Sequence, residues 1–301
     1  RGKSELTLNL AIDFAGATDT ASGTLSDGAN WVSQIHADRI VWAPEQELAT
    51  SFTNRYTLLL PGFDNDEDGP AGYSYATITV NELGKVKVSG AMADQHKISQ
   101  STYVSKNGAW PFFASLYTAR DQVVTNATKV VTNKEWHGST MGWLTFLPNT
   151  NAGTTNLAPQ GEVSWIKTYW TNSYWTNGFT NQVEAFSSRH LPPLKNQETA
   201  AYDFTDALLV LSGGDLTEPF TNSIFLKTNT SFQVIKPAVN ELKASLNKNS
   251  GLISGSFRHP ANTNTTTKWA GVMLQDYNYG AGYFLGVDAG GVVELAPVSD
   301  E

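Results

Sequence analysis

The sequence has no cysteine, few charged residues and no long apolar run. The absence of cysteine excludes disulfide bonds, thiolate zinc sites and cysteine nucleophiles. Charged residues make up 16% of the chain and the net charge is −8. Because no Lys/Arg-rich run exists to neutralise phosphates, we expect no nucleic-acid partner. No apolar stretch approaches the roughly 20 residues that a membrane helix needs, so we expect no membrane span.

Long helix-forming segments are also missing, which excludes a helix bundle or a coiled coil. Strand-like patterns do not alternate with helical ones, and this argues against a doubly wound sheet. The chain is instead rich in Thr, Asn, Ser, Gly and aromatic residues, which is typical of short strands joined by polar turns.

The sequence opens with Arg1-Gly2-Lys3. This is not an apolar signal segment, so we expect any export signal to have been removed or to lie outside this sequence.

Apolar and polar residues alternate with a period of two along most of the chain, beginning at Leu6–Phe14. Turn sequences such as Asn81-Glu82-Leu83-Gly84 separate the runs. A Ser-Gly-x-apolar pattern recurs inside strands at Ser22, Ser89 and Ser254, and a glycine at mid-strand marks a bend or a close approach of backbones. We predict an all-β, antiparallel protein of two barrel-like lobes built from hairpins, with a flat sandwich as the alternative.

One segment, 187–196, is the candidate domain linker, because it contains Pro192-Pro193 between strand-like runs. The sequence thus predicts an N-terminal β-lobe over residues 1–186, which includes an aromatic connection. A C-terminal β-lobe follows over residues 197–301.

Short motifs follow one another in a fixed order along the chain. They include Gly72-Tyr73, Ser105-Lys-Asn-Gly-Ala-Trp-Pro111, Gly142-Trp143-Leu144, Gly161-Glu-Val-Ser-Trp-Ile-Lys167, Leu211-Ser-Gly-Gly214, Ser250-Gly-Leu-Ile-Ser-Gly-Ser-Phe257 and Gly282-Tyr-Phe-Leu-Gly286. From about Leu6 to Pro297 the series resembles a β-rich module found at the C-terminal end of large secreted or cell-surface proteins of environmental bacteria. The resemblance implies an extracellular or cell-surface location and brings no activity, ligand or catalytic residue. The acidic loop at Asp64 and a doubled aromatic tract depart from it.

The acidic loop places Asp64, Asp66 and Asp68 at alternate positions before Gly69. This is the first half of a calcium-binding loop, in which three carboxylates converge and the glycine permits the turn. The second half is missing, because the twelfth position is Tyr75 instead of a glutamate. A solvated acidic turn is therefore the alternative to a calcium site.

The aromatic tract contains Tyr169, Trp170, Tyr174 and Trp175 in a near-repeat of Tyr-Trp-Thr-Asn every five residues. Exposed aromatic rings beside Asn and Thr could stack on sugars, so extracellular glycans are one candidate ligand. The same rings could pack a long connection onto the barrel wall or form a subunit contact, since each can bury about 150–250 Å².

Signatures of catalysis are absent from the sequence. The histidines are scattered, and none has a second histidine at metal-ligand spacing. No Gly-x-Ser-x-Gly elbow and no phosphate-binding glycine loop occurs. A carboxylate pair for glycoside hydrolysis stays open, because the separation of two carboxylates depends on the tertiary structure. We predict that the protein is not an enzyme and has no certain cofactor, with calcium as the candidate ion.

Regular strands lie near both ends of the chain, at Leu6–Phe14 and Val292–Leu295. Such strands can add to an exposed edge of the next subunit and build a head-to-tail filament. We predict an extracellular structural protein, a pilus-like fibre or surface-layer subunit. The alternative is a monomeric carbohydrate-binding or adhesive surface module in which the first strand completes its own barrel. The residues predicted to form the subunit contact are Leu6, Leu8, Leu10, Ile12 and Phe14.

Overall fold

The computed structural model describes residues 5–13, 16, 18–43, 48–126, 129–171, 174–193, 202–228 and 230–298, and between 119 and 134 the backbone alone. This part of the chain forms twenty-one strands and three 3₁₀ turns, at Thr150–Ala152, Val239–Glu241 and Gln275–Tyr277. Its strand pairings are antiparallel throughout. The structure confirms the all-β, antiparallel prediction.

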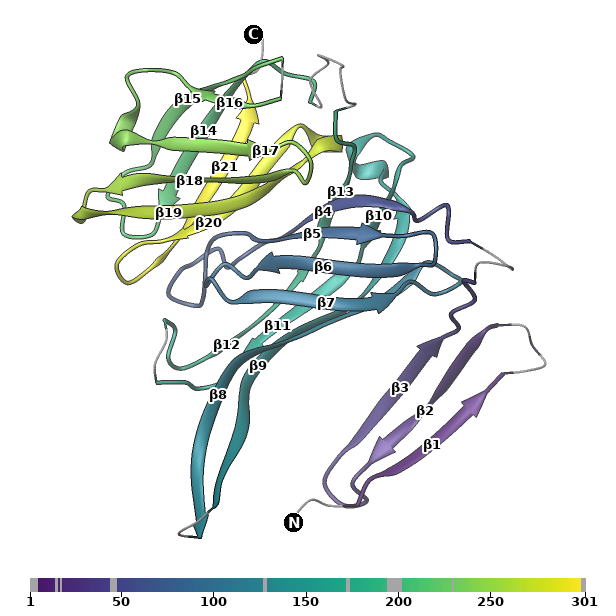
Figure 1. Cartoon of the computed structure of the whole chain (residues 1–301). Coiled ribbons are helices and arrows are strands. Elements are labelled where there is room, and N and C mark those ends of the chain that lie inside the picture. Colours follow the sequence, from purple (N-terminus) through teal and green to yellow (C-terminus); the bar gives the residue numbers. More distant parts are fainter. Residues whose placement is uncertain are drawn as a thin grey trace.

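A three-stranded sheet begins the chain and stands apart from the rest (Figure 1). It consists of β1 (Thr7–Ile12), β2 (Thr20–Ser26) and β3 (Val32–Asp38), in that order. The turn between β2 and β3 is held by Asp27, whose carboxylate accepts hydrogen bonds from the backbone and side-chain amides of Asn30. Among the described residues, no strand of this sheet pairs with a strand of the lobes, so the first strand does not complete a barrel.

The N-terminal lobe consists of two five-stranded sheets that share one core. The first sheet has the order β13-β4-β5-β6-β7 and contains β4 (Asn54–Leu60), β5 (Ser74–Val80), β6 (Lys85–Ala91), β7 (Lys97–Tyr103) and β13 (Phe186–His190). The second contains β8 (Ala109–Asn126), β9 (Lys129–Pro148), β10 (Leu157–Gln160), β11 (Glu162–Lys167) and β12 (Phe179–Glu184). Buried side chains from both sheets form the core, among them Tyr56, Ile78, Val86, Trp110 and Leu144.

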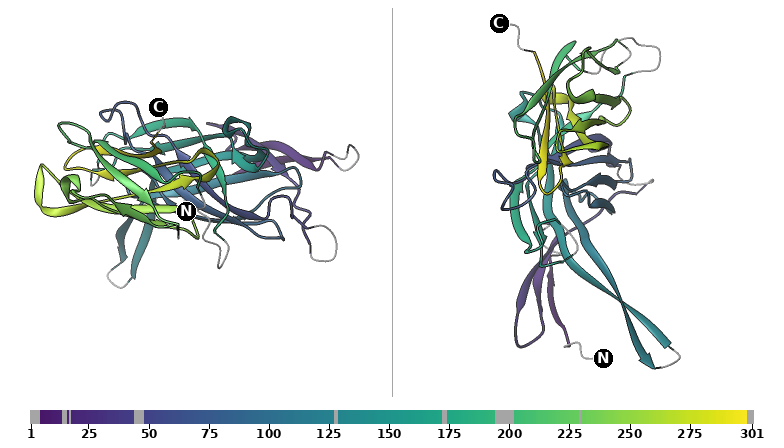
Figure 2. Two further views of the ribbon diagram at one scale, coloured as in Figure 1. Left: turned by 90° about the horizontal axis from the view of Figure 1, so that it is seen from above. Right: turned by 90° about the vertical axis from the view of Figure 1, so that its left-hand side faces the viewer.

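The edges of these two sheets meet on both sides, which makes the lobe barrel-like. Gln100 of β7 donates a hydrogen bond to the carbonyl of Pro111 in β8, and Ser187 of β13 donates one to the carbonyl of Pro159 in β10. Strands β8 and β9 continue beyond the lobe as a two-stranded arm. Figure 2 shows this arm and the β1–β3 sheet extending from the same end of the molecule.

The C-terminal lobe is one eight-stranded sheet with the order β16-β15-β14-β21-β20-β19-β18-β17. Its end strands β16 and β17 approach each other, so the sheet is nearly closed. The strands are β14 (Asp206–Gly213), β15 (Phe220–Leu226), β16 (Phe232–Val234), β17 (Lys243–Asn247), β18 (Leu252–His259), β19 (Asn262–Leu274), β20 (Tyr279–Leu285) and β21 (Gly290–Pro297). The interior is filled by apolar side chains such as Leu209, Phe257, Trp269, Phe284 and Val293.

Three mid-strand glycines lie where backbones approach closely, as the repeated Ser-Gly pattern predicts. A Cβ added to Gly23, Gly90 or Gly255 would lie 2.0, 2.0 and 1.9 Å from a carbonyl oxygen of the neighbouring strand. Any larger residue at these positions would force the paired strands apart.

The segment predicted as a linker begins as a strand. Residues 187–190 belong to β13, which pairs with β4 and buries Ser188 and His190. Alternate burial against the lobe outweighs the two prolines, which follow the strand's end. The rest of the segment, from residue 194 to 196, lies outside the described residues.

The two lobes pack against each other through a small apolar cluster. Leu59 of β4 lies against Val272 and Ala281 of the barrel. The hydroxyl of Thr57 donates a buried hydrogen bond of 2.7 Å to the carbonyl of Met273. The barrel wall and the first sheet therefore form a continuous surface.

Candidate functional site

The β1–β3 sheet carries the apolar row that the first strand predicts. Leu6, Leu8, Leu10 and Ile12 are 54%, 56%, 48% and 53% exposed, and all six residues of β1 are exposed. Residues paired across strands project from the same face, and Leu25 of β2 lies opposite Leu8. The four apolar residues thus share one face with Leu25. Phe14, the fifth predicted contact residue, lies outside the described residues.

Both edges of this sheet are open within the described part of the chain, because β1 and β3 each pair with β2 alone. Natural edge strands are commonly blunted by a lysine, a proline or a bulge. Strand β1 reads Thr-Leu-Asn-Leu-Ala-Ile and has none of these devices. It is therefore able to accept a further strand.

The C-terminal strand does not share this property. Strand β21 pairs with β14 on one side and β20 on the other, so its backbone groups are used inside the barrel. The expectation that a strand at each end could add to another subunit is wrong for this end. Sequence periodicity marks a strand but does not tell a central strand from an edge strand.

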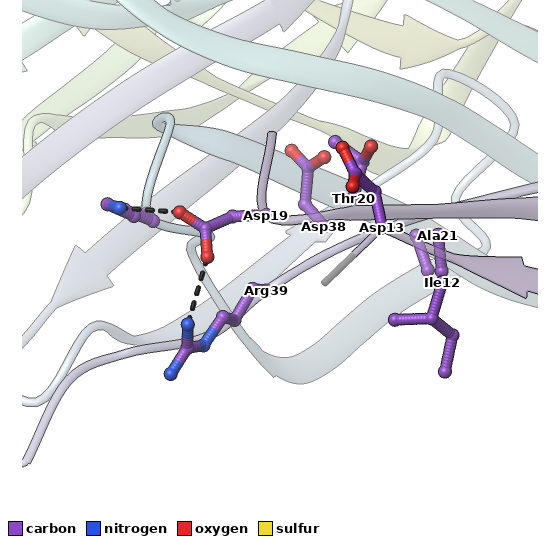
Figure 3. Close-up of a pocket in the computed structure, with 9 residues that line it drawn as sticks. Ile12, Asp13, Asp19, Thr20, Ala21, Asp38 and Arg39 are labelled. Carbon is purple, nitrogen blue, oxygen red and sulfur yellow. Dashed lines mark hydrogen bonds and ion pairs between the residues drawn. The ribbon is translucent and has the colours of Figure 1, made fainter. Parts of the chain in front are cut away.

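The sheet is joined to the N-terminal lobe through a polar junction around Asp19. Its carboxylate binds Arg39 at 3.0 Å (Figure 3) and also binds the Lys106 ammonium on the turn before β8. These hydrogen bonds, first that of Lys106 and then that of Arg39, hold the pKa of Asp19 below its ordinary value. Ser105 donates a further hydrogen bond of 3.0 Å to Asp38.

A pocket of about 670 Å³ lies at this junction, and Figure 3 shows the carboxylates of Asp13, Asp19 and Asp38 around it. Asp13 accepts hydrogen bonds from the Gly16 amide and the Thr18 hydroxyl. The carboxylates are therefore used in turns and ion pairs. The junction fixes one end of the sheet, and the apolar row of β1 stays exposed within the described part of the chain.

The aromatic tract packs mainly onto the protein. The ring of Trp170 stacks on His137 at 5.7 Å between centroids, with an interplanar angle of 2°. Trp175 donates its indole N–H to the carbonyl of Asp66 at 2.8 Å, and Tyr174 donates to the carbonyl of Val287 at 3.1 Å. Tyr169, by contrast, is 61% exposed. Three of the four rings thus fasten the connection to the N-terminal lobe and to a barrel loop.

Lys167 holds this tract in place, and the sequence analysis missed it. The side chain is 3% exposed, and its ammonium donates to the carbonyls of Tyr174 at 3.0 Å and Trp175 at 2.6 Å. Burial lowers the pKa of Lys167. A signal was available, since the period of two in β11 puts Lys167 on the same face as the buried Val163 and Trp165.

A buried polar network lies beside Lys167. The Tyr117 hydroxyl donates to Asp94 at 2.6 Å and accepts the Trp165 indole N–H at 2.8 Å. Burial, together with the negative charge of Asp94, raises the pKa of Tyr117. His96 lies 3.2 Å from the same carboxylate. The network joins the β6–β7 turn to β11, and its His96 and Tyr117 rings contact Trp170 of the aromatic tract.

The three carboxylates of the acidic loop do not converge on one point. Asp66 turns inward and accepts the Gly290 amide at 2.8 Å, while Asp64 and Asp68 are exposed. Burial raises the pKa of Asp66, and the amide bonds to it act in the opposite direction. Across the described residues, no three His, Asp or Glu side chains are grouped so that they could hold a metal ion. The loop's visible role is to tie the N-terminal lobe to the barrel.

No protein-family profile matches the chain, and no curated protein does. Among solved structures, the vaccine antigen transferrin-binding protein B from Haemophilus parasuis is similar at 10% identity with a TM-score of 0.26. The match covers 99% of this chain and 66% of that chain. In the portion of the chain that is described, no helix is long and apolar enough to cross a membrane.

Proposed function

We propose that this chain is an extracellular structural subunit that associates with copies of itself through the β1–β3 sheet. The observation that carries the proposal is the exposed edge strand β1, which has no lysine, proline or bulge and whose apolar row no described element covers. A sheet with one apolar face is stable when another element covers that face. A second copy whose sheet packs against this face would supply that cover, and the two open edges would join further copies.

The sheet has two open edges, β1 on one side and β3 on the other. When β1 of one copy pairs with β3 of the next, the contact joins two different surfaces and leaves one of each free at the ends. Such a contact propagates and gives a pilus-like fibre or a surface layer. Backbone hydrogen bonds would supply affinity and the apolar row would set the register.

The extracellular setting is part of the proposal and rests on composition. A cysteine-free chain rich in Thr, Asn and Gly derives its stability from sheet packing and does not depend on reduction or oxidation. The resemblance to a module of secreted and surface proteins agrees with this setting. The proposal assigns no catalytic role to any residue.

The test compares the intact chain with variants of the first sheet by analytical ultracentrifugation and electron microscopy. We expect the intact chain to assemble with rising concentration and Leu8→Lys with Leu10→Lys to stay monomeric. Ser22→Lys with Thr24→Lys adds the same charge to the polar face of the central strand and should still assemble. The two pairs differ in the face that they change.

Deletion of residues 1–15 separates assembly from folding. No residue of β1–β3 belongs to the buried apolar clusters of the described chain, so the deletion should leave the melting temperature of the lobes unchanged and abolish assembly. Intact chains that remain monomeric at high concentration, or a deletion variant that assembles as before, would refute the proposal.

A further inference from the structure

Six strands that form one face of the molecule contain no acidic residue. They are β5, β6 and β7 of the N-terminal lobe and β17, β18 and β19 of the barrel, which lie on the same side of the molecule in Figure 1 and in the right-hand view of Figure 2. The chain as a whole carries 28 acidic residues and a net charge of −8. The acidic charge is therefore concentrated elsewhere, and this face stands out as basic.

Five lysines lie on these strands. Each alternates with core side chains along its strand, so each projects outward from the lobe. They are Lys85, Lys87, Lys97, Lys243 and Lys268. None of the five forms an ion pair with a described residue, whereas Arg258 on β18 is paired with Glu241 at 2.9 Å.

A groove of about 770 Å³ runs across this face between the two lobes. Its size lies within the range of about 300–1,000 Å³ that is usual for ligand sites. Lys97 borders it from β7 and Lys268 from β19, and no Asp or Glu of the described residues lines it. The ring of Tyr75 stacks on Tyr283 at 6.1 Å, with an interplanar angle of 25°, where the lobes meet in the groove.

Hydroxyl groups dominate the rest of the lining. Thr77 and Ser89 contribute from the N-terminal lobe, and Ser250, Ser254, Ser256 and Thr266 from the barrel. A second hollow of about 340 Å³ shares Thr77 and Ser89 and continues along β5–β7 past Lys87. The result is an elongated polar track that crosses both lobes.

We propose that this groove binds an acidic polysaccharide, a chain of sugars that carry carboxylates. Unpaired lysines attract the negative charges, and Ser and Thr hydroxyls can donate to and accept from sugar hydroxyls. The half-buried ring of Tyr75 borders the groove and can contact a sugar ring, while Tyr283, on which it stacks, is buried. A nucleic acid presents a charge every 1.7 Å of duplex, and tight binding to it requires many cations, whereas the groove holds two.

The site is independent of the self-association proposed above. It lies on strands of the two lobes and involves none of the residues of β1–β3. A monomeric variant such as Leu8→Lys with Leu10→Lys should therefore bind the polysaccharide as the intact chain does. Loss of assembly with retained polysaccharide binding, or the reverse, then shows which of the two proposals has failed.

The test is electrophoresis of the full chain through native gels that contain polygalacturonate, dextran or no polymer, followed by titration calorimetry. We expect polygalacturonate to retard the protein and neutral dextran to have no effect. Lys97→Gln with Lys268→Gln should weaken binding about tenfold, since each exposed charge contact contributes a few-fold in affinity. Replacing both lysines with arginine should preserve binding.

Lys227→Gln with Lys236→Gln is the matched control, because both lysines are exposed and lie outside the six strands. This pair removes the same net charge and should bind like the intact chain. Equal weakening in both pairs, or no retardation by polygalacturonate, would overturn the proposal. Binding to duplex DNA at least as tight as to polygalacturonate would also overturn it, because the face would then be a general polyanion surface.

Discussion

Replacing Lys167 with methionine should release the aromatic tract from the N-terminal lobe. Methionine has a similar apolar stem and keeps most of the packing, but it removes the ammonium that donates to Tyr174 and Trp175. Two backbone carbonyls on a connection without regular secondary structure then lose their donor. The substitution therefore isolates the electrostatic part of the contact.

The magnitude follows from the two hydrogen bonds. A hydrogen bond to a charged group stabilises a protein by about 1.5–3 kcal/mol, so the two together contribute about 3–6 kcal/mol. Because both bonds come from one ammonium they are not fully additive, and we expect a net loss of about 2–4 kcal/mol. With an unfolding entropy of about 2.1 cal/mol/K per residue over 301 residues, this loss lowers the melting temperature by about 3–6 °C.

Calorimetry measures the global loss, and limited chymotrypsin digestion measures the local release. The tract contains Tyr169, Trp170, Tyr174 and Trp175, which are chymotrypsin sites, and cleavage there should become several-fold faster. Lys227→Met is the control, because Lys227 is exposed and such substitutions usually change stability by less than about 0.5 kcal/mol. An unchanged melting temperature together with unchanged digestion of the Lys167 variant would refute the role assigned to this lysine.

Two further predictions concern the acidic loop and the buried tyrosines. Asp66→Ala should lower the melting temperature, because the hydrogen bond to the Gly290 amide is lost, and the loss should be the same with and without a calcium chelator. If a chelator instead lowers the melting temperature of the intact chain and not that of the variant, the result would support calcium at Asp64, Asp66 and Asp68. Burial raises the pKa of Tyr56 from 10.0 to about 12 and also raises that of Tyr279, so the folded chain keeps protons that the unfolded chain loses above pH 10. Melting temperatures should thus be insensitive to tyrosine ionisation below pH 10 and fall between pH 10 and 12, less steeply in Tyr279→Phe, and a rise over that interval would contradict the assignment.

The sequence alone determined the local features of this protein. Alternation with a period of two marks a strand wherever it occurs, because successive side chains of an extended backbone point to opposite faces. This is why the strands and the apolar row from Leu6 to Ile12 were predictable. The turn at Asn81 was predictable from its Asn and Gly residues. The close approach at Gly23, Gly90 and Gly255 was predictable for a similar reason, since a glycine inside a strand pattern has few other structural uses.

The tertiary structure decided which faces and edges are covered. The alternation in β1 and β11 is similar, yet the apolar row of β1 is exposed while Lys167 of β11 is buried. Covering a face requires a partner that is distant in sequence, and no local pattern specifies that partner. The same holds for β21, which is central, and for Asp66, whose partner Gly290 lies 224 residues away.

The basic face depended most strongly on the fold. Residues 74–103 and 243–274 are separated by more than a hundred positions, and neither segment alone has the density of Lys and Arg that identifies a basic site in a sequence. Packing of the barrel against the first sheet places the two segments on either side of one groove. Electrostatic potential sums over space and not along the chain, so this property emerged only when both lobes were in place.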